Sequence, residues 1–467
     1  MRVVRNDEGM TYVSINPATG AEESRFDYHD AAEIERRLDQ AHATWLRWRA
    51  TSFEERGALM VAAAQLLEGE IPVAGELLTK EMGKTFASAK GEVAKCALAM
   101  RYYAEHAQEF LATELIASPA KRSGVRYEPI GPVLAIMPWN FPLWQVIRFA
   151  APALMAGNVG VLKHASNVPG TAHFLEQLFE RAGFPKGAFT NLFVTVDEVG
   201  EIIGDDRIAA VTLTGSERAG RSVGALAGHH LKKSVLELGG SDAFVVAHSA
   251  DLARTVPLAV TARIQNNGQS CIASKRFIVV SSRAEEFTER FTTAMDEVVM
   301  GDPFDAATVL GPVVSASQRE ELAGQVEDSV AKGAVAATGG VVPDGPGFFF
   351  PATVLTGVTS AMRAGCEEMF GPVATVHVAT DLAAAIEFAN STPWGLGASI
   401  WAEDGEEQHQ GVEHLEAGMV FVNAVVASTP ELPFGGIKRS GYGRELGIHG
   451  IREFTNAKTF FVAQDQS

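Results

Sequence analysis

The sequence predicts an α/β protein with a parallel sheet covered by helices on both faces, followed by a second α/β region. From Val133 onward, short and almost continuously apolar runs alternate with helical stretches, which is typical of parallel strands buried on both sides. The same alternation resumes near Phe244 and extends to about Gly441. Because such sheets bind ligands beyond the carboxyl ends of their strands, functional residues are expected there.

The expected elements follow in chain order. The first 110 residues are mainly helical, with an apolar stripe at three- and four-residue steps formed by Ile34, Leu38, Ala41, Trp45 and Trp48. A short extended stretch is expected around residues 123–127, and a strand-like tail over residues 455–464. The strands expected in the first sheet are 133–137, 159–162, 192–195, 210–213 and 235–238, with helices near 143–156 and 171–182. In the second region, strands are expected at 277–280 and 398–401.

Length and charge narrow the class of protein. A chain of 467 residues predicts two or three domains. The net charge of −18 argues against nucleic acid and anionic membranes as partners, because both need a basic surface. No apolar run reaches the roughly 18 residues that span a bilayer, and residues 1–8 lack the apolar core of a secretory signal. Three cysteines form neither a disulfide framework nor a zinc-type spacing, so a reduced, cytoplasmic protein without a metal is expected.

Cys271 is the candidate nucleophile. It ends the polar, glycine-containing run Gln265-Asn266-Asn267-Gly268-Gln269-Ser270-Cys271. Cys96 falls in a helical pattern as a small buried side chain, and Cys366 precedes two glutamates. An ordinary cysteine is only about 3% thiolate at pH 7, so a nucleophilic Cys271 needs a base, a helix N-terminus or a nearby cation.

Two polar side chains stand at strand ends. Glu237 lies between two leucines and before two glycines, and a carboxylate on an apolar strand is costly to bury. It is either an edge-strand side chain that reaches water or a carboxyl with a raised pKa held ready for proton transfer. Asn140, between Pro138 and Pro142, is either a turn residue or a donor to a developing oxyanion.

A phosphate site is suggested where a strand gives way to a helix. Thr214-Gly215-Ser216 ends an expected strand, and Gly220 and Gly224 follow. Free N–H groups and the helix dipole favour an anion at such a place. The run is not the G-x-G-x-x-G fingerprint, so on its own it is a weak indication.

Together these stretches resemble the aldehyde dehydrogenase superfamily, over essentially the whole chain. The matching pieces, in the order in which the family has them, are Pro138-Trp139-Asn140-Phe141-Pro142, Lys163 after its strand, Thr214-Gly215-Ser216, Leu236-Glu237-Leu238-Gly239-Gly240, Gly268-Gln269-Ser270-Cys271, Glu367-Glu368-Met369-Phe370-Gly371-Pro372 and Pro433-Phe434-Gly435-Gly436.

The resemblance implies a catalytic role for three residues. Cys271 would attack the aldehyde as a thiolate, and the Asn140 amide and the Cys271 N–H would hold the oxyanion, each such donor lowering the barrier by about 3 kcal/mol. Hydride transfer to a nicotinamide would leave a thioester, and Glu237 would activate the water that hydrolyses it.

The resemblance also implies an organisation. A Rossmann-type NAD(P)-binding domain would comprise residues 1–110 and 130–239, and a second α/β catalytic domain residues 240–440. Residues 111–129 and 441–467 would form a small oligomerisation element of a homodimer or homotetramer. The cofactor would contact Trp139, Lys163, Gly215 and Ser216, with Glu368 and Phe370 near the nicotinamide ribose.

The run Lys163-His164-Ala165-Ser166 bears on the choice of cofactor. NAD-preferring relatives often have a glutamate three residues after the lysine, where this chain has Ser166. A carboxylate there would repel a 2′-phosphate, whereas Lys163 with Ser166 accommodates one. NADP is therefore the expected cofactor, with NAD as the alternative.

Arg148, eight residues after Asn140, bears on the substrate. It is either a surface or interface arginine or, by resemblance to bacterial succinate-semialdehyde dehydrogenases, a grip on the substrate's distal carboxylate. That resemblance is carried by residues 143–148, 163–165, 239–242 and 267–271, and Ser428 would also touch the carboxylate. Some members of this group have an arginine where this chain has Gln265, and a redox-switch cysteine where it has Ala273. The grip is therefore expected to be looser, and that disulfide switch is excluded.

Oxidation of succinate semialdehyde to succinate is thus the expected activity. A broad aldehyde dehydrogenase acting on uncharged or amino aldehydes remains an alternative, as does a catalytically silent nucleotide-binding homologue. A CoA-acylating enzyme is less expected, because Glu237 supplies a base for hydrolysis.

Overall fold

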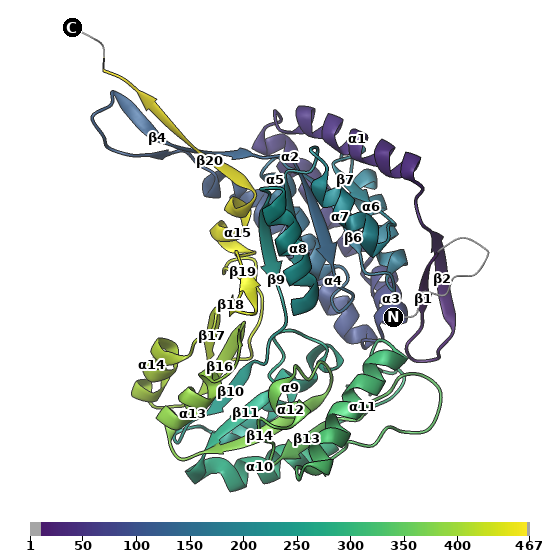
Figure 1. The fold of residues 1–467 in the computed structure, drawn as a ribbon, viewed down its shortest axis with the longest axis vertical. Coiled ribbons are helices and arrows are strands. Elements are labelled where there is room, and N and C mark those ends of the chain that lie inside the picture. The colour runs from purple at the N-terminus through teal and green to yellow at the C-terminus, as the bar shows by residue number, and fades with distance from the viewer. Residues whose placement is uncertain (1–10, 465–467) are drawn as a thin grey trace.

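The computed structural model describes residues 11–464. Residues 1–8, on which the expected absence of a secretory signal rests, lie outside this range. Within it the chain forms two stacked α/β halves and a projecting arm, as Figure 1 shows. The two α/β halves are what the alternation of apolar runs and helices predicted.

The first sheet has six strands in the order β19-β9-β8-β5-β6-β7. All neighbours pair in parallel except β19, which runs antiparallel to β9. The strands are β5 (Pro132–Met137), β6 (Val159–His164), β7 (Phe189–Asn191), β8 (Ala210–Thr214), β9 (Lys233–Glu237) and β19 (Gly441–Tyr442).

The strand expected at 192–195 is wrong, because β7 ends at Asn191. The apolar residues that follow are a buried connection to the next helix, and Thr195 caps that helix with a reciprocal bond to Glu198. Burial alone had made this connection resemble a strand.

Helices cover both faces of the first sheet and share one apolar core with it. Polar residues such as Asp30, Ser52 and Thr85 cap the starts of N-terminal helices. The helices are α1 (Ala31–Trp48), α2 (Phe53–Gly69), α3 (Ile71–Met82), α4 (Phe86–Phe110), α5 (Trp144–Met155), α6 (Pro169–Arg181), α7 (Val196–Gly204) and α8 (Glu217–His229).

The N-terminal region is mainly helical, as predicted, but it also contains a hairpin that was not predicted. Strands β1 (Thr11–Ile15) and β2 (Glu22–Asp27) pair antiparallel before α1. Tyr12, whose hydroxyl donates to the Val194 carbonyl at 2.6 Å, ties β1 to the first half. A long-range contact of this kind leaves no local pattern.

The second sheet has seven strands in the order β12-β13-β14-β11-β10-β16-β17, and only the β12–β13 pair is antiparallel. Its strands are β10 (Ala243–Val246), β11 (Arg276–Val280), β12 (Val335–Thr338), β13 (Thr353–Thr356), β14 (Val373–Ala379), β16 (Gly397–Trp401) and β17 (Met419–Val422). Its helices are α9 (Leu252–Ile264), the 3₁₀ turn η1 (Gln265–Gly268), α10 (Ser281–Asp296), α11 (Ala316–Ala331), α12 (Arg363–Cys366), α13 (Leu382–Asn390) and α14 (Gly405–His414). A small pair, β15 (Trp394–Gly395) with β18 (Ile437–Lys438), lies beside this sheet.

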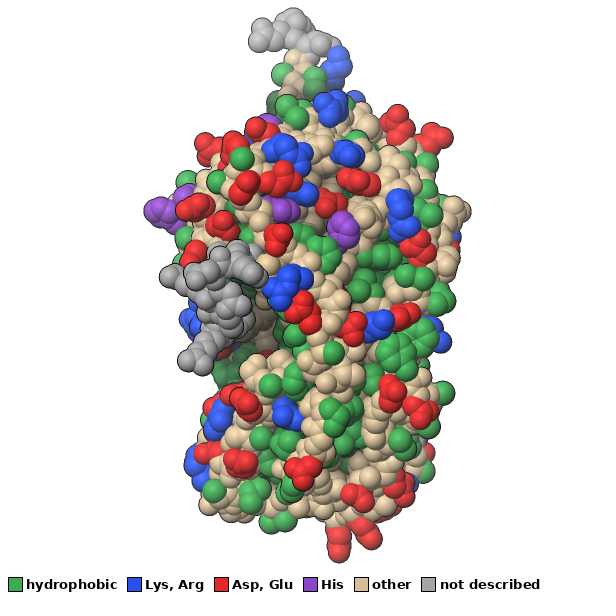
Figure 2. Space-filling model, turned by 90° about the vertical axis from the view of Figure 1, so that its right-hand side faces the viewer, with side chains coloured by type: hydrophobic (Ala, Val, Ile, Leu, Met, Phe, Trp, Pro, Cys, Tyr) green, Lys and Arg blue, Asp and Glu red, His purple; other side chains and the backbone are tan. Residues whose placement is uncertain are grey.

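A third sheet forms the arm. Strand β4 (Arg122–Pro129) lies between β3 (Glu114–Leu115) and β20 (Thr455–Val462), all antiparallel, and β20 follows the short helix α15 (Gly447–Glu453). The arm leaves the body at the upper left of Figure 1 and forms the projection at the top of Figure 2. Over the face seen in Figure 2, acidic and basic side chains are interspersed.

Across residues 11–464, no single helix has the length and apolar character needed to cross a membrane. Only α2 and α3, bent by 73° at their junction, pass that test as a pair, by length and composition alone.

Candidate active site

A cavity of about 400 Å³ opens where the carboxyl ends of the first sheet meet the second half of the chain. The loop after β5, the end of β8, the residues after β9 and the Cys271 loop all contribute to it. Its lining is Pro138, Trp139, Asn140, Gln145, Thr214, Gly215, Ser216, Leu238, Gly239, Cys271, Gln318, Glu368 and Phe370. Segments far apart in the sequence thus meet where the motifs predicted a ligand.

The loop that presents Cys271 has an unusual backbone. Asn266, Asn267 and Gly268 all have positive φ, at 55°, 57° and 73°. Asparagine tolerates this region better than most residues, and here its amides also hold the loop: Asn267 donates to the Gly83 and Pro312 carbonyls at 2.8 and 2.9 Å. A side chain at Gly268 would come within 2.4 Å of the Gly371 backbone. The polar run before Cys271 is therefore used to fix the nucleophile's position.

Two cations act on the Cys271 thiol. Burial raises its pKa to about 12, while Arg148 and Lys275 oppose that rise. Lys275 is buried and donates to the Ser270 carbonyl at 2.9 Å and to the Cys271 carbonyl. The thiol is thus protonated in this state, and Lys275, which the sequence reasoning missed, is the nearest cation in sequence to assist its ionisation.

Asn140 lies in the same cavity as Cys271. Its side chain is 4% exposed, and its amide nitrogen donates to the Gln269 carbonyl at 3.1 Å. An amide nitrogen has two N–H groups, so one remains for a ligand atom. The arrangement provides a fixed donor beside the thiol.

Glu237, at the end of β9, is 2% exposed and has no hydrogen-bond partner on either carboxylate oxygen. Burial raises the pKa of Glu237 well above its usual range, and Glu445 raises it further, whereas Arg148 and Arg444 lower it. Because β19 covers β9 and pairs Gly441 with Glu237, the alternative of an edge-strand glutamate reaching water does not hold. Glu237 does not line the Cys271 cavity in this conformation.

Glu445 is a second carboxyl that the sequence reasoning missed. It is buried, burial raises its pKa, and it forms an ion pair with Arg148. Glu445 lies near Glu237 because the pairing of β19 with β9 brings the C-terminal segment beside this strand, and the sequence alone does not indicate that pairing.

Five of the expected cofactor residues line the cavity: Trp139, Gly215, Ser216, Glu368 and Phe370. The Trp139 and Phe370 rings meet edge to face, with centroids 5.7 Å apart. Gln318, which no motif indicated, lines the cavity and donates to the Phe370 carbonyl at 3.0 Å.

The expected phosphate positions lie at two strand ends. Ser216 caps α8 by accepting from the Ala219 N–H at 3.3 Å, and because Ser216 also lines the cavity, this helix begins at the cavity wall. Lys163 and Ser166, at and after the end of β6, do not line the cavity. Burial lowers the pKa of Lys163 to about 8, and no carboxylate among residues 11–464 forms an ion pair with it. The residues present therefore fit a nucleotide that carries an additional phosphate.

Arg148 and Ser428 lie outside the Cys271 cavity. The Arg148 guanidinium is 2% exposed, lies 4.4 Å from the Phe434 ring centroid, and donates to Thr214 Oγ1 at 3.3 Å besides its pair with Glu445. Ser428 lines a separate cavity of about 180 Å³. The carboxylate-binding roles expected for both remain predictions.

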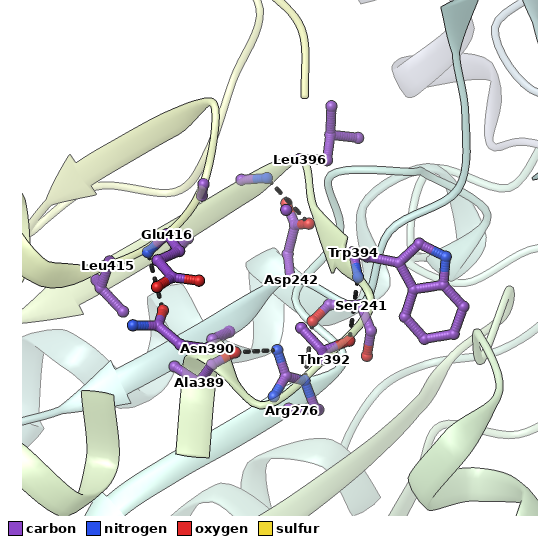
Figure 3. A pocket seen from close by; sticks show the side chains of 15 residues that line it. Ser241, Asp242, Arg276, Ala389, Asn390, Thr392, Trp394, Leu396, Leu415 and Glu416 are labelled. Carbon is purple, nitrogen blue, oxygen red and sulfur yellow. Dashed lines mark hydrogen bonds between the residues drawn. The ribbon is translucent and has the colours of Figure 1, made fainter. Parts of the chain in front are cut away.

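A further recess, shown in Figure 3, lies in the second half around Asp242 and Arg276. Its volume of about 10 Å³ suffices for about one water molecule. Asp242 accepts from the Gly397 N–H at 3.1 Å, and Arg276 donates to the Ala389 carbonyl at 2.9 Å, so these side chains hold strands and helix ends together. Within the described part of the chain, no cluster of His, Cys, Asp and Glu could hold a metal ion.

Comparison with known proteins agrees with this geometry. The family model described as the aldehyde dehydrogenase family matches residues 4–460. A succinate-semialdehyde dehydrogenase of the NADP(+) type from Mycobacterium leprae is 51% identical, over 97% of this chain and 100% of the relative. A crystal structure of succinic semialdehyde dehydrogenase from Streptococcus pyogenes, with NADP+ as the cofactor, has a TM-score of 0.95 and 38% identity, over 97% of this chain and 100% of the other.

Proposed function

Because the chain belongs to the aldehyde dehydrogenase family, as its motifs predicted, we propose that it oxidises succinate semialdehyde to succinate with NADP. The observation that carries the reaction is the meeting of Cys271 and Asn140 in one cavity with the start of α8. The substrate and cofactor are supported by the names of its 50–51% identical relatives, among them those of Mycobacterium leprae and Mycobacterium tuberculosis.

The residues divide the reaction between them. Cys271 attacks the aldehyde carbon as a thiolate, and its proton leaves to solvent or a nearby base. The free N–H of the Asn140 amide stabilises the oxyanion that forms. A nicotinamide bound in this cavity would supply the acceptor for the hydride. The resulting Cys271 thioester is hydrolysed by water, whose proton Glu237 accepts, and the thiol is released with succinate.

Glu237 needs two changes to act as the base. Its carboxyl is protonated while buried, and it must reach the water that attacks the thioester. Arg148 and Arg444 favour the ionised form that accepts a proton. The pKa of Glu237 is thus raised by burial and held down in part by these two arginines, and a carboxyl with a raised pKa is a stronger base once ionised.

The cofactor's place is supported by the residues at the carboxyl edge of the first sheet. Trp139 and Phe370 flank the cavity near Cys271, and Ser216 with the first turn of α8 can hold phosphate oxygens. Lys163 supplies a cation for a 2′-phosphate, and Ser166 leaves room for it. Measuring kcat/KM with NADP and with NAD tests this: NADP is preferred, and an NAD preference of about tenfold or more, equal to about 1.4 kcal/mol, would refute it.

The substrate is tested with a panel of aldehydes assayed with NADP. Succinate semialdehyde should have a higher kcat/KM than butanal, which has the same chain length without the carboxylate. One observation favours a broad aldehyde dehydrogenase instead: Arg148 is already paired with Glu445. Equal values for the two aldehydes would select that alternative.

An assembly of two or four copies is part of the proposal. The arm sheet projects from the body and carries exposed apolar side chains, among them Leu115, Ile116 and Phe461. Light scattering of the intact protein should give the mass of a dimer or tetramer, whereas a monomer would contradict the proposal. A cytoplasmic location also stays a prediction.

A further inference from the structure

Lys95, Ser428 and Trp144 form a polar cluster that no motif of the sequence indicated as a unit. Lys95, on α4, donates from Nζ to Ser428 Oγ at 2.7 Å. Trp144, at the start of α5, donates from its indole N–H to the same oxygen at 3.0 Å. The Lys95 ammonium also lies 4.0 Å from the Trp144 ring centroid. Three segments distant in sequence are thus built around one serine oxygen.

This cluster contains donors without an acceptor. Because Ser428 Oγ already accepts two hydrogen bonds, its own O–H is left to donate. The Lys95 ammonium has three N–H groups, and Ser428 is its one hydrogen-bond acceptor among residues 11–464. The serine is 6% exposed and the lysine half-buried, so water satisfies these donors poorly.

The nearest carboxylate is already engaged elsewhere. Glu92, one turn before Lys95 on α4, forms a buried ion pair with Lys84 and accepts from the Leu143 and Trp144 N–H groups, both at 2.9 Å. No ion pair joins Lys95 to any carboxylate in the described part of the chain. Burial, together with the smaller effect of the Arg148 charge, lowers the pKa of Lys95 to about 8. A bound anion would reverse both effects.

One member of the cluster, Ser428, lines a cavity that is separate from the one lined by Cys271. Ser428 and Phe434 line the cavity of about 180 Å³. Phe434 also contacts Arg148, whose charge acts on the Cys271 thiol. Neighbouring residues of α5 join the two places, since Trp144 bonds Ser428 while Gln145 lines the Cys271 cavity.

We propose that Lys95, together with the Ser428 hydroxyl, binds the distal carboxylate of the aldehyde substrate and so determines the specificity of this enzyme. The inference rests on the proposed function, since it requires a carboxylate-bearing aldehyde. It places a cation at Lys95 on α4, which forms no ion pair among residues 11–464, whereas the Arg148 guanidinium is already paired with Glu445 and the position that holds an arginine in some relatives is Gln265 here.

The test replaces Lys95 with methionine, which keeps the apolar stem against Trp144 and removes the charge. For succinate semialdehyde, kcat/KM should fall by about 10- to 100-fold, mainly through KM, because a charge-assisted hydrogen bond is lost. For butanal, kcat/KM should stay within about threefold of the wild type, because butanal has no carboxylate. Lys95→Arg should retain most of the preference.

Lys90→Met is the matched control. Lys90 lies on the same helix and over an aromatic ring, 4.7 Å from the Phe86 centroid, but it is exposed. This variant should leave both substrates unaffected. Inhibition by succinate against butanal gives a second readout, because its inhibition constant should rise in Lys95→Met by the same factor as KM.

The pH dependence of KM gives a third readout. The carboxylate binds the protonated lysine, so in the wild type KM for succinate semialdehyde should rise as the pH passes above about 8. In Lys95→Met this rise should be absent, and KM for butanal should show none in either protein. A merely structural lysine would not produce this difference.

The outcomes separate the two claims. If the wild type prefers succinate semialdehyde and Lys95→Met keeps that preference, the role of Lys95 is refuted and the proposed function stands. Equal losses for both substrates in Lys95→Met also refute it, since they indicate a structural role. If the wild type shows no preference for carboxylate-bearing aldehydes, the proposed substrate fails and the role of Lys95 fails with it.

Discussion

Replacing Arg148 with methionine removes the positive charge that lies among Cys271, Glu237 and Glu445. Arg148 pairs directly with Glu445, and it lowers the pKa of both Cys271 and Glu237. At about 4 Å and an effective dielectric constant of about 20, opposite unit charges attract by about 4 kcal/mol. This attraction, weaker at the two catalytic residues than at Glu445, is what the substitution removes.

The sign of the effect on activity follows from the direction of each shift. Without Arg148 the pKa of Glu237 and that of the Cys271 thiol both rise, so at a given pH less base and less thiolate is present. The acid limb of the kcat profile should move to higher pH by about one unit or more, because each unit corresponds to about 1.4 kcal/mol. Activity at neutral pH should fall for succinate semialdehyde and butanal alike, and recover partly at alkaline pH.

The assay records kcat and kcat/KM for both aldehydes between pH 6 and pH 10, together with unfolding by denaturant. Leaving Glu445 buried without its partner should also cost about 3–5 kcal/mol of stability, and the double variant Arg148→Met with Glu445→Gln should regain most of it. An unmoved profile with a KM increase confined to succinate semialdehyde would refute this reasoning. That result would instead support the carboxylate grip expected from the sequence.

Three further predictions concern the nucleophile's partners and the cofactor. Glu237→Gln should still release about one NADPH per site in a rapid burst while steady-state turnover falls by about 10²- to 10⁴-fold, and loss of the burst would contradict its role in hydrolysis. Asn140→Ala should lower the rate of that burst by about 10²- to 10³-fold, because the oxyanion loses a donor; an unchanged burst would remove Asn140 from that role. Ser166→Glu should lower kcat/KM for NADP by at least about tenfold relative to NAD, through repulsion of the 2′-phosphate, and an unchanged ratio would mean that Ser166 does not face that phosphate.

Strands β5, β6, β8 and β9 of the first sheet could be predicted because they are short, apolar and separated by recognisable helices. The same signals failed at residues 192–195, where burial arises from a connection and not from a strand. The β1–β2 hairpin was not predicted for a related reason, since the contact that holds it to the body, from Tyr12 to the Val194 carbonyl, joins residues far apart in the chain. Local periodicity reports which residues are buried, but it does not report by what.

In the candidate site, too, the residues that stand in local motifs could be predicted, and those that matter only through tertiary contacts could not. Asn140 and Ser216 stand in short motifs after strands and Cys271 in one before β11, and the structure brings the three to one cavity. Lys275 and Glu445 carry no such motif, and their importance comes from charges placed near Cys271 and Glu237 by tertiary packing. Electrostatic neighbours of this kind require coordinates.

The pairing of β19 with β9 has a consequence for how the enzyme is made. Gly435, Gly441 and Glu445, which surround Glu237, are synthesised about 200 residues after it. A nascent chain therefore has its nucleophile and its oxyanion donor well before the environment of its base exists. The groups that set the pKa of the hydrolytic base are thus the last part of the active site to be synthesised.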